Sequence, residues 1–124
     1  MRVLVCGGRD FGLIMSERFF IEQELHKILN PDNEKLLPIK YIIITGGAKG
    51  VDTIAHTIAL KNYLMTEVYL ADWKKYGKSA GYIRNKQMLD EGKPDLVIAF
   101  PGGKGTKMMV KLAKEAGIEV IDYN

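Results

Sequence analysis

The sequence predicts an α/β protein of the doubly wound, Rossmann-like type, a three-layer sandwich around a five-stranded parallel sheet. Short runs of Val, Ile and Leu recur along the chain, as in strands that are buried on both faces. Segments with apolar residues at helical spacing separate these runs. Glycine clusters follow three of the runs and hold eight of the thirteen glycines. With 124 residues, the chain is expected to form one domain over residues 1–124.

The first half of the chain is expected to contain two strands and two helices in alternation. Uninterrupted apolar runs predict strands at about residues 2–6 and 40–44. Apolar residues three and four positions apart predict helices at about 16–29 and 51–63. Residues 30–38 carry two prolines and several polar residues, so we expect a surface loop there.

The second half repeats the alternation. Asp72–Ala80 is expected to be a long loop after the third strand, on the edge of the sheet where loops often carry function. Gly117 is expected to follow the end of the last helix. The remaining strands are expected at about 66–71, 95–99 and 118–122, and the remaining helices at about 80–91 and 105–116.

Strands that alternate with helices predict right-handed crossovers and helices on both faces of the sheet. The strand order that we expect for such a sheet is 3-2-1-4-5. The first and fourth strands would flank the point where the winding direction reverses. Folds of this type bind ligands there, at the carboxyl ends of their strands. The glycine clusters follow the first, second and fourth strands, so they are expected to meet at this edge.

Composition excludes several classes of protein. The net charge is +3 and the lysines are dispersed, so nucleic acid is an unlikely partner. The single cysteine, Cys6, cannot form an internal disulfide and is expected to be packed, which favours the cytoplasm. We expect no membrane segment and no signal peptide, since the first strand begins at the N-terminus.

The third cluster, Pro101-Gly102-Gly103-Lys104-Gly105-Thr106, is the strongest indication of function. Free N–H groups at the start of a helix favour an anion such as phosphate, and Thr106 is expected to cap that helix. The spacing is neither that of a P-loop nor that of the dinucleotide fingerprint. The alternative is a glycine-rich turn that binds no ligand.

The second cluster is Thr45-Gly46-Gly47-Ala48-Lys49-Gly50, followed by Asp52. It offers another place for phosphate. Asp52 either caps the helix that begins there or accepts hydrogen bonds from a ribose or a base, and both roles are compatible.

Arginines near two of these segments are expected to neutralise the anion. Gly7-Gly8-Arg9-Asp10 ends the central strand, where Arg9 would either contact phosphate or pair with Asp10 on the surface. Arg84, next to Asn85, would either complete the anion site or pair with Asp90 or Glu91.

Aromatic residues after the third strand are candidates to cover a base. Trp73 and Tyr76 would stack on it, or would serve core packing or a subunit interface instead. His26 and His56 have no partners at metal-ligand spacing, so no metal and no cofactor is expected. The predicted phosphate- and nucleotide-binding residues are Gly7, Gly8, Arg9, Asp10, Thr45, Gly46, Gly47, Ala48, Gly50, Asp52, Trp73, Arg84, Asn85, Pro101, Gly102, Gly103, Gly105 and Thr106.

Taken together, GGRDF, TGGAKGVD, ADWKKYGKSAGYIRNKQML and AFPGGKGT resemble the YspA-like branch of the SLOG superfamily, which groups DprA/Smf proteins with the Lonely Guy (LOG) enzymes. The resemblance runs from the first strand to the last helix. It implies a Rossmann-like fold that binds nucleotides or molecules derived from them. It also implies a homo-oligomer, for which Met108–Met109 or Phe19–Phe20 would supply an apolar surface, or would be buried against the sheet.

The LOG enzymes hydrolyse the N-glycosidic bond of nucleoside monophosphates with a Glu in the motif Pro-Gly-Gly-x-Gly-Thr-x-x-Glu. Pro101–Thr106 match this motif, but the Glu position holds Met109, which cannot act as a general acid or base. The resemblance therefore favours a protein that binds an ADP-ribose-like, cyclic ADP-ribose-like or other phosphorylated adenosine derivative, as a sensor or as a phage protein that sequesters a defence signal. The alternative is a phosphoribohydrolase in which Asp10, Asp52 or Asp72 replaces the Glu.

Overall fold

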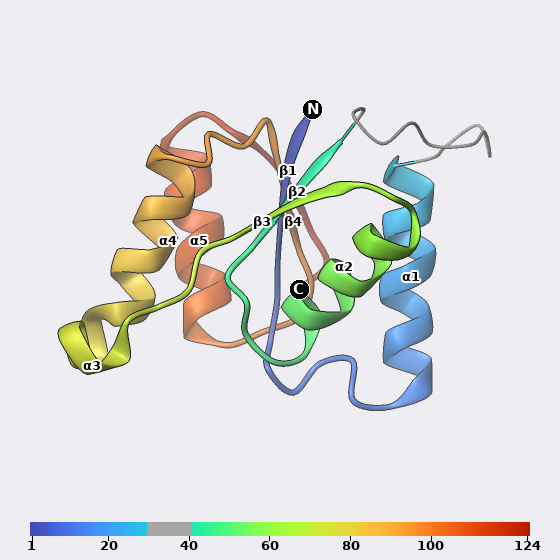
Figure 1. The fold of residues 1–124 in the computed structure, drawn as a ribbon, viewed down its shortest axis with the longest axis horizontal. Coiled ribbons are helices and arrows are strands. Elements are labelled where there is room, and N and C mark those ends of the chain that lie inside the picture. The colour runs from blue at the N-terminus through green and yellow to red at the C-terminus, as the bar shows by residue number, and fades with distance from the viewer. Residues whose placement is uncertain (30–40) are drawn as a thin grey trace.

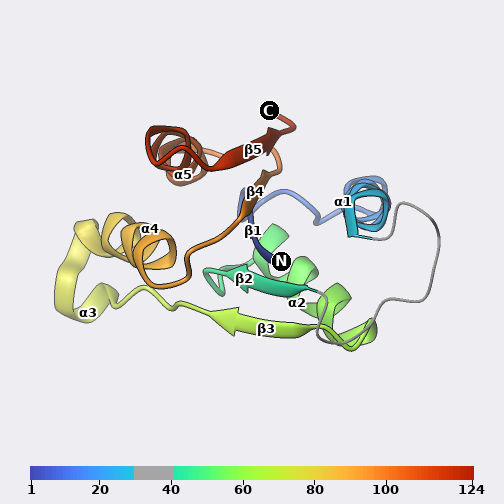
Figure 2. The ribbon, with the colours of Figure 1, turned by 90° about the horizontal axis from the view of Figure 1, so that it is seen from above.

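The computed structural model describes residues 1–29 and 41–124, and within them the chain forms a three-layer α/β/α sandwich (Figures 1 and 2). The parallel strands are β1 (Arg2–Cys6), β2 (Ile42–Thr45), β3 (Met65–Val68), β4 (Leu96–Ala99) and β5 (Glu119–Asp122). Their order, β3-β2-β1-β4-β5, confirms the predicted topology. The loop predicted at residues 30–38 lies outside the described residues.

Helices cover both faces of the sheet because successive side chains of a strand point to opposite sides. Val3 and Val5 of β1 pack on the side of α1 (Met15–Leu29) and α2 (Val51–Lys61). Leu4 and Cys6 pack on the side of α4 (Ala80–Asp90) and α5 (Lys104–Glu115). Figure 2 shows the two helix pairs on opposite sides of the strands. This double burial explains why the sequence of β1 is apolar without interruption.

The centre and the edges of the sheet differ in burial. β1 pairs with both β2 and β4, and Val3, Leu4 and Val5 have no exposed surface. The edge strand β3 is partly exposed and shorter than the predicted run at 66–71. The Tyr69 N–H still donates to the Thr45 carbonyl at 2.9 Å, and the chain then leaves the sheet.

The prediction of a loop at Asp72–Ala80 is wrong in part, because much of this segment is helical. It contains the one-turn helix α3 (Trp73–Tyr76) and the 3₁₀ turn η1 (Gly77–Ser79). Asp72 begins α3 by accepting a hydrogen bond from the Lys75 N–H at 3.1 Å. Four residues are too few for helical periodicity to be visible in the sequence.

Two apolar pairs on the helices have different surroundings. Met109 is buried, so it cannot supply an intermolecular surface. Phe20 packs edge-on against Phe100 and Tyr123, whereas Phe19 is 62% exposed. Among residues 1–29 and 41–124, no helix has the length and apolar character that would let it cross a membrane.

Candidate functional site

The three glycine segments meet at the carboxyl edge of the sheet, where Gly8 joins them. The Gly8 N–H donates to the Pro101 carbonyl at 2.9 Å, and the Gly8 carbonyl accepts from the Val51 N–H at 3.4 Å. Gly8, in the first segment, thus connects the third segment with α2, the helix that follows the second segment. The predicted convergence at the reversal point of the sheet is present in the structure.

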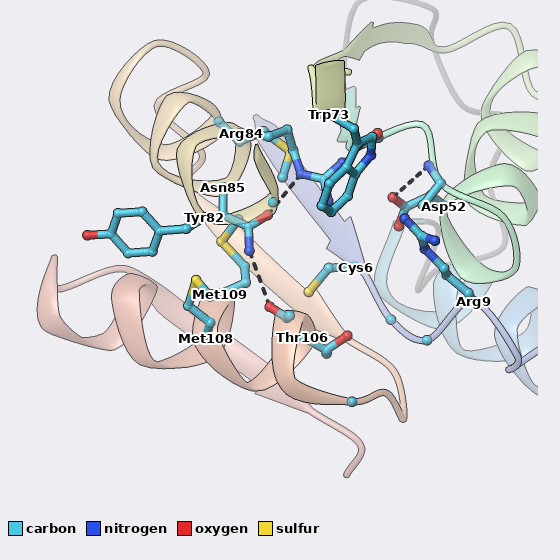
Figure 3. Close-up of a pocket in the computed structure, with 18 of the residues that line it drawn as sticks. Cys6, Arg9, Asp52, Trp73, Tyr82, Arg84, Asn85, Thr106, Met108 and Met109 are labelled. Carbon is cyan, nitrogen blue, oxygen red and sulfur yellow. Dashed lines mark hydrogen bonds between the residues drawn. The ribbon is translucent and has the colours of Figure 1, made fainter. Parts of the chain in front are cut away.

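A pocket of about 490 Å³ opens at this edge, on the side of the sheet that α4 and α5 cover (Figure 3). This size is typical of small-molecule sites. Twelve of the predicted residues line it: Gly7, Gly8, Arg9, Gly46, Ala48, Asp52, Trp73, Arg84, Asn85, Gly103, Gly105 and Thr106. The wall also contains Cys6, Lys78, Gly81, Tyr82, Met88, Met108 and Met109.

The other six predicted residues do not line this pocket. Asp10, Pro101 and Gly102 line a smaller depression that shares Gly8, Arg9 and Gly103 with it. Thr45, Gly47 and Gly50 shape the second segment instead. Tyr76, a candidate to cover a base, is also absent from the wall, and the Lys75 ammonium lies 5.1 Å from its ring centroid.

Two backbone N–H groups of the second segment donate to the protein's own side chains. The Ala48 N–H donates to Asp52 Oδ2 at 3.2 Å, and the Gly47 N–H donates to Thr45 Oγ1 at 3.4 Å. Asp52 therefore holds the loop before α2, whose N-cap is Gly50. The expectation that this segment presents free amides to phosphate is wrong for these two groups.

Gly50 is required by the packing of two segments against each other. Its φ is +77°, which side-chain-bearing residues rarely adopt. A Cβ there would lie 2.4 Å from the Gly8 carbonyl oxygen and 2.6 Å from that of Arg9. Glycine at this position allows close contact between loops rather than contact with a ligand.

Arg84 crosses from α4 to the second segment. Its Nη1 donates to the Gly46 carbonyl at 2.7 Å, and its Nε donates to Asn85 Oδ1 at 3.0 Å. The predicted alternative, a pair with Asp90 or Glu91, is therefore wrong. Asn85 in turn donates from Nδ2 to the Gly105 carbonyl at 3.2 Å, so the two residues link the second segment, α4 and α5.

Asp52 is a buried carboxyl on the pocket wall. Burial raises its pKa to about 6, while the Ala48 N–H, Arg84, the Gly46 backbone and Arg9 favour the ionised form. Burial lowers the pKa of Arg84, and the negative charge of Asp52 opposes that change. Asp52 thus lies in the pKa range in which a carboxyl exchanges protons near neutral pH.

Arg9 does not form the predicted ion pair with Asp10. Its guanidinium instead lies 5.7 Å from the centroid of the Trp73 ring, which joins the first segment to α3 across the pocket mouth. Among the described lining residues, Arg9, Lys78 and Arg84 carry positive charge and Asp52 is the carboxylate. The pocket therefore favours an anion.

The start of α5 is open, in contrast to the second segment. A Cβ at Gly103 or at Gly105 would find no heavy atom within 4 Å. Gly103 is the N-cap and its carbonyl accepts from the Lys107 N–H at 3.1 Å, so the N–H groups of the first turn have no partner inside the helix. Thr106 is buried and does not cap the helix, which corrects the prediction.

The structure limits what chemistry the other side chains can perform. Burial, reinforced by Asp52 and Asp122, raises the pKa of Cys6, so its thiol is a poor nucleophile. Met109 lines the pocket and has 1% exposure, so no carboxylate stands at the position of the LOG glutamate. Of the proposed replacements, Asp72 begins α3 and Asp10 lies in the adjoining depression, which leaves Asp52 on the pocket wall.

Sequence reasoning missed several wall residues. Tyr82 lies three positions before Asn85 on α4, and Met108 lies three positions after Gly105 on α5. Residues three positions apart lie on the same face of a helix. The helical spacing from Asn85 and Gly105 could therefore have indicated both as wall residues. In residues 1–29 and 41–124, no group of three or more His, Cys, Asp and Glu side chains is arranged to hold a metal ion.

Known proteins resemble this chain in sequence and in fold. Residues 1–76 match the YspA, cpYpsA-related SLOG family. The Gene 61 protein of Mycobacterium phage D29 is 33% identical over 129 residues, covering 98% of this chain and 95% of the relative.

Two solved structures share the fold. The structural-genomics target TM1055 superposes with a TM-score of 0.71 at 21% identity, over 96% of this chain and 71% of that one. DNA processing protein A (DprA) from Streptococcus pneumoniae superposes with a TM-score of 0.73 at 20% identity. That match covers 98% of this chain and 49% of DprA, so the chain spans about half of that protein.

Proposed function

The chain belongs to the YspA, cpYpsA-related SLOG family, and we propose that its pocket binds a nucleotide-derived ligand that carries phosphate. The ligand class is an ADP-ribose-like, cyclic ADP-ribose-like or other phosphorylated adenosine derivative. One observation carries the proposal. The open start of α5 and three cationic side chains belong to the same pocket at the reversal point of the sheet.

The contacts give each residue a role in this proposal. Phosphate would lie at the first turn of α5, beside Gly103 and Gly105, where the helix dipole favours negative charge. Arg9 and Arg84 would neutralise it. Asp52 would accept a hydrogen bond from ribose in addition to those that it accepts from the second segment. The second segment supports the site by positioning Asp52 and Arg84.

The biological role we propose is sensing or sequestration of the ligand. Met109 replaces a catalytic carboxylate with an apolar side chain, which favours a ligand that is held rather than cleaved. The similarity to a phage protein supports sequestration of a host signal as one form of this role.

One observation favours an enzyme as a second candidate function. Asp52 has a pKa raised to about 6 and lies on the wall of the pocket. A carboxyl in this range can act as a general acid or base at neutral pH. The corresponding reaction is hydrolysis of the N-glycosidic bond of a nucleoside monophosphate.

Mass spectrometry of small molecules released from the purified protein by heat distinguishes the two functions. A binding protein releases an intact phosphorylated nucleoside derivative. An enzyme, incubated with nucleoside monophosphates, instead yields free base and ribose 5-phosphate, and this yield disappears in Asp52→Asn. Absence of any nucleotide-derived compound, together with no binding of added nucleotides in calorimetry, contradicts both functions.

We also propose that the protein forms a homo-oligomer through apolar residues just before α1 and in its first turns. Leu13, Ile14, Met15 and Phe19 there are 60% exposed or more, which is costly for a monomer. Light scattering coupled to size exclusion should show a dimer or larger species. Phe19→Ser should shift it toward the monomer, whereas a monomeric wild-type protein contradicts the proposal.

A further inference from the structure

The pocket has two chemically different sides. Figure 3 shows Arg9 and Asp52 on one side, and Tyr82, Met108 and Met109 on the other, between α4 and α5. Tyr82, Met108 and Met109 are uncharged, and Met88, which packs in the same buried cluster as Met109, also lines the pocket. We call Tyr82, Met88, Met108 and Met109 the thioether wall. Asn85 and Thr106 lie between the two sides (Figure 3).

From this division we propose that the thioether wall holds the aromatic base of the ligand while the first turn of α5 holds its phosphate. This inference rests on the proposed function and specifies how the ligand lies in the pocket. It assigns base recognition to Tyr82 and the methionines instead of to Trp73.

Trp73 is a poor stacking surface for a base because its ring already contacts other parts of the protein. The Arg9 guanidinium lies 5.7 Å from its ring centroid and so covers one face. The ring edge is also close to α4, since a Cβ at Gly81 would lie 3.5 Å from Trp73 Cη2. Trp73 therefore positions Arg9 at the pocket mouth, where the guanidinium faces the anion.

The thioether wall has the properties that an aromatic ring requires. Thioether sulfurs are polarizable and make favourable contacts with rings, and methionine side chains adapt to the shape of the group they contact. Met88 and Met109 are 2% and 1% exposed, so they form a packed floor, while Tyr82 is 47% exposed and can pack on the opposite face. No charged group of the wall would have to lose its water to admit the ring.

Asn85 adds polar recognition beside this wall. It is 5% exposed, its Oδ1 accepts from Arg84 Nε, and its Nδ2 donates to the Gly105 carbonyl. An amide carries two N–H groups, so one remains to donate to a ring nitrogen or carbonyl of a base. Met109 follows Gly105 by four residues, about 6 Å along α5, which leaves room for a sugar between phosphate and base.

The test compares two probes that differ only in the base, AMP and ribose 5-phosphate, by calorimetry on the full chain. We expect wild-type protein to bind AMP about tenfold more tightly or better. Tyr82→Ala should reduce that ratio to about two or less without weakening ribose 5-phosphate, since the tyrosine contacts only the base. Met108→Gln, which keeps the length of the side chain, should also lower the ratio.

Trp73→Ala is the matched control, because Trp73 is exposed to a similar extent. It should weaken both probes equally through Arg9 and leave the ratio unchanged. A ratio that is lost in Trp73→Ala but kept in Tyr82→Ala overturns the inference while ribose 5-phosphate binding still supports the proposed function. A wild-type ratio near one overturns it as well. Failure of both probes to bind wild-type protein contradicts the proposed function itself.

Discussion

The second and third glycine segments, Thr45–Gly50 and Pro101–Thr106, have similar sequences but different surroundings at most of their glycines. In the second segment, Asp52 and Thr45 accept the N–H groups of Ala48 and Gly47. Arg84 binds the Gly46 carbonyl there. In the third, Gly103 and Gly105 face open space at the start of a helix.

The difference shows that glycine-rich turns at a ligand-binding edge serve two purposes. In one segment glycine lets loops approach each other, and in the other it leaves backbone N–H groups accessible. The first purpose predicts that substitutions damage folding, and the second that they damage binding.

Gly50→Ala should produce the largest loss of stability. Alanine at a φ of +77°, with its Cβ 2.4 Å from the Gly8 carbonyl oxygen, would force the first and second segments apart. We expect a loss of about 3 kcal/mol or more in the free energy of unfolding, measured by urea denaturation.

Gly105→Ala is the control for this substitution within the third segment. The position is helical and open, so alanine should change stability by less than about 1 kcal/mol, and in the stabilising direction. Equal losses in the two variants would mean that the segments do not differ as described.

Asp52→Asn should stabilise the protein at neutral pH. The pKa of Asp52 rises from 3.8 to about 6 on folding, so the folded state binds the extra proton. Stability therefore falls as pH rises from about 4 to about 6, and above that range the ionised carboxyl costs about 1–3 kcal/mol. Asparagine keeps an oxygen for the Ala48 N–H and removes the charge.

Urea denaturation at pH 4 and pH 7 checks this prediction, with Asp10→Asn at an exposed carboxyl as the control. The advantage of Asp52→Asn should be larger at pH 7 than at pH 4. A gain in stability that is equal at both pH values would contradict a raised pKa of Asp52 in the folded protein.

Among the destabilising substitutions, Thr45→Val should have the smallest effect. Thr45 is fully buried, but its hydrogen bond from the Gly47 N–H is long, at 3.4 Å. Loss of this bond, with valine filling the same volume, should cost about 1 kcal/mol or less. Circular dichroism melting would detect it as a shift of a few degrees, and a loss as large as that of Gly50→Ala would contradict its minor role.

The fold was predictable because its three central strands, β1, β2 and β4, are apolar almost without interruption. Residues such as Val3 to Val5 are buried on both faces, and this burial is visible as a continuous apolar run. The helical turn at Trp73–Tyr76 was not predicted, since it is too short for periodicity. Its one local indication was Asp72, a residue type that favours N-caps.

The position of the candidate site was predictable, but its internal contacts were not. Glycine clusters that follow three strands predict a pocket at the carboxyl edge of the sheet. This prediction does not depend on which side chains surround the pocket. The partners of Ala48 and Gly46 depend on how Asp52 and Arg84 approach from α2 and α4. The contact of Arg84 with Gly46 joins residues 38 positions apart and has no signature in local sequence, whereas Asp52 lies only four residues after Ala48. Tyr82 and Met108 share helix faces with predicted residues, so helical spacing could have indicated them.

The most direct test of the account is the affinity of Gly103→Val for ADP-ribose and AMP, measured by calorimetry. Valine fits the extended backbone of Gly103, and its side chain would cover the open first turn of α5. Ala116→Val, which places the same valine side chain at the exposed other end of α5, is the control.

We predict that Gly103→Val loses binding by about 100-fold or more while its unfolding transition stays close to that of wild type and of Ala116→Val. Unchanged affinity in a folded Gly103→Val protein would contradict the claim that the start of α5 holds the phosphate of the ligand.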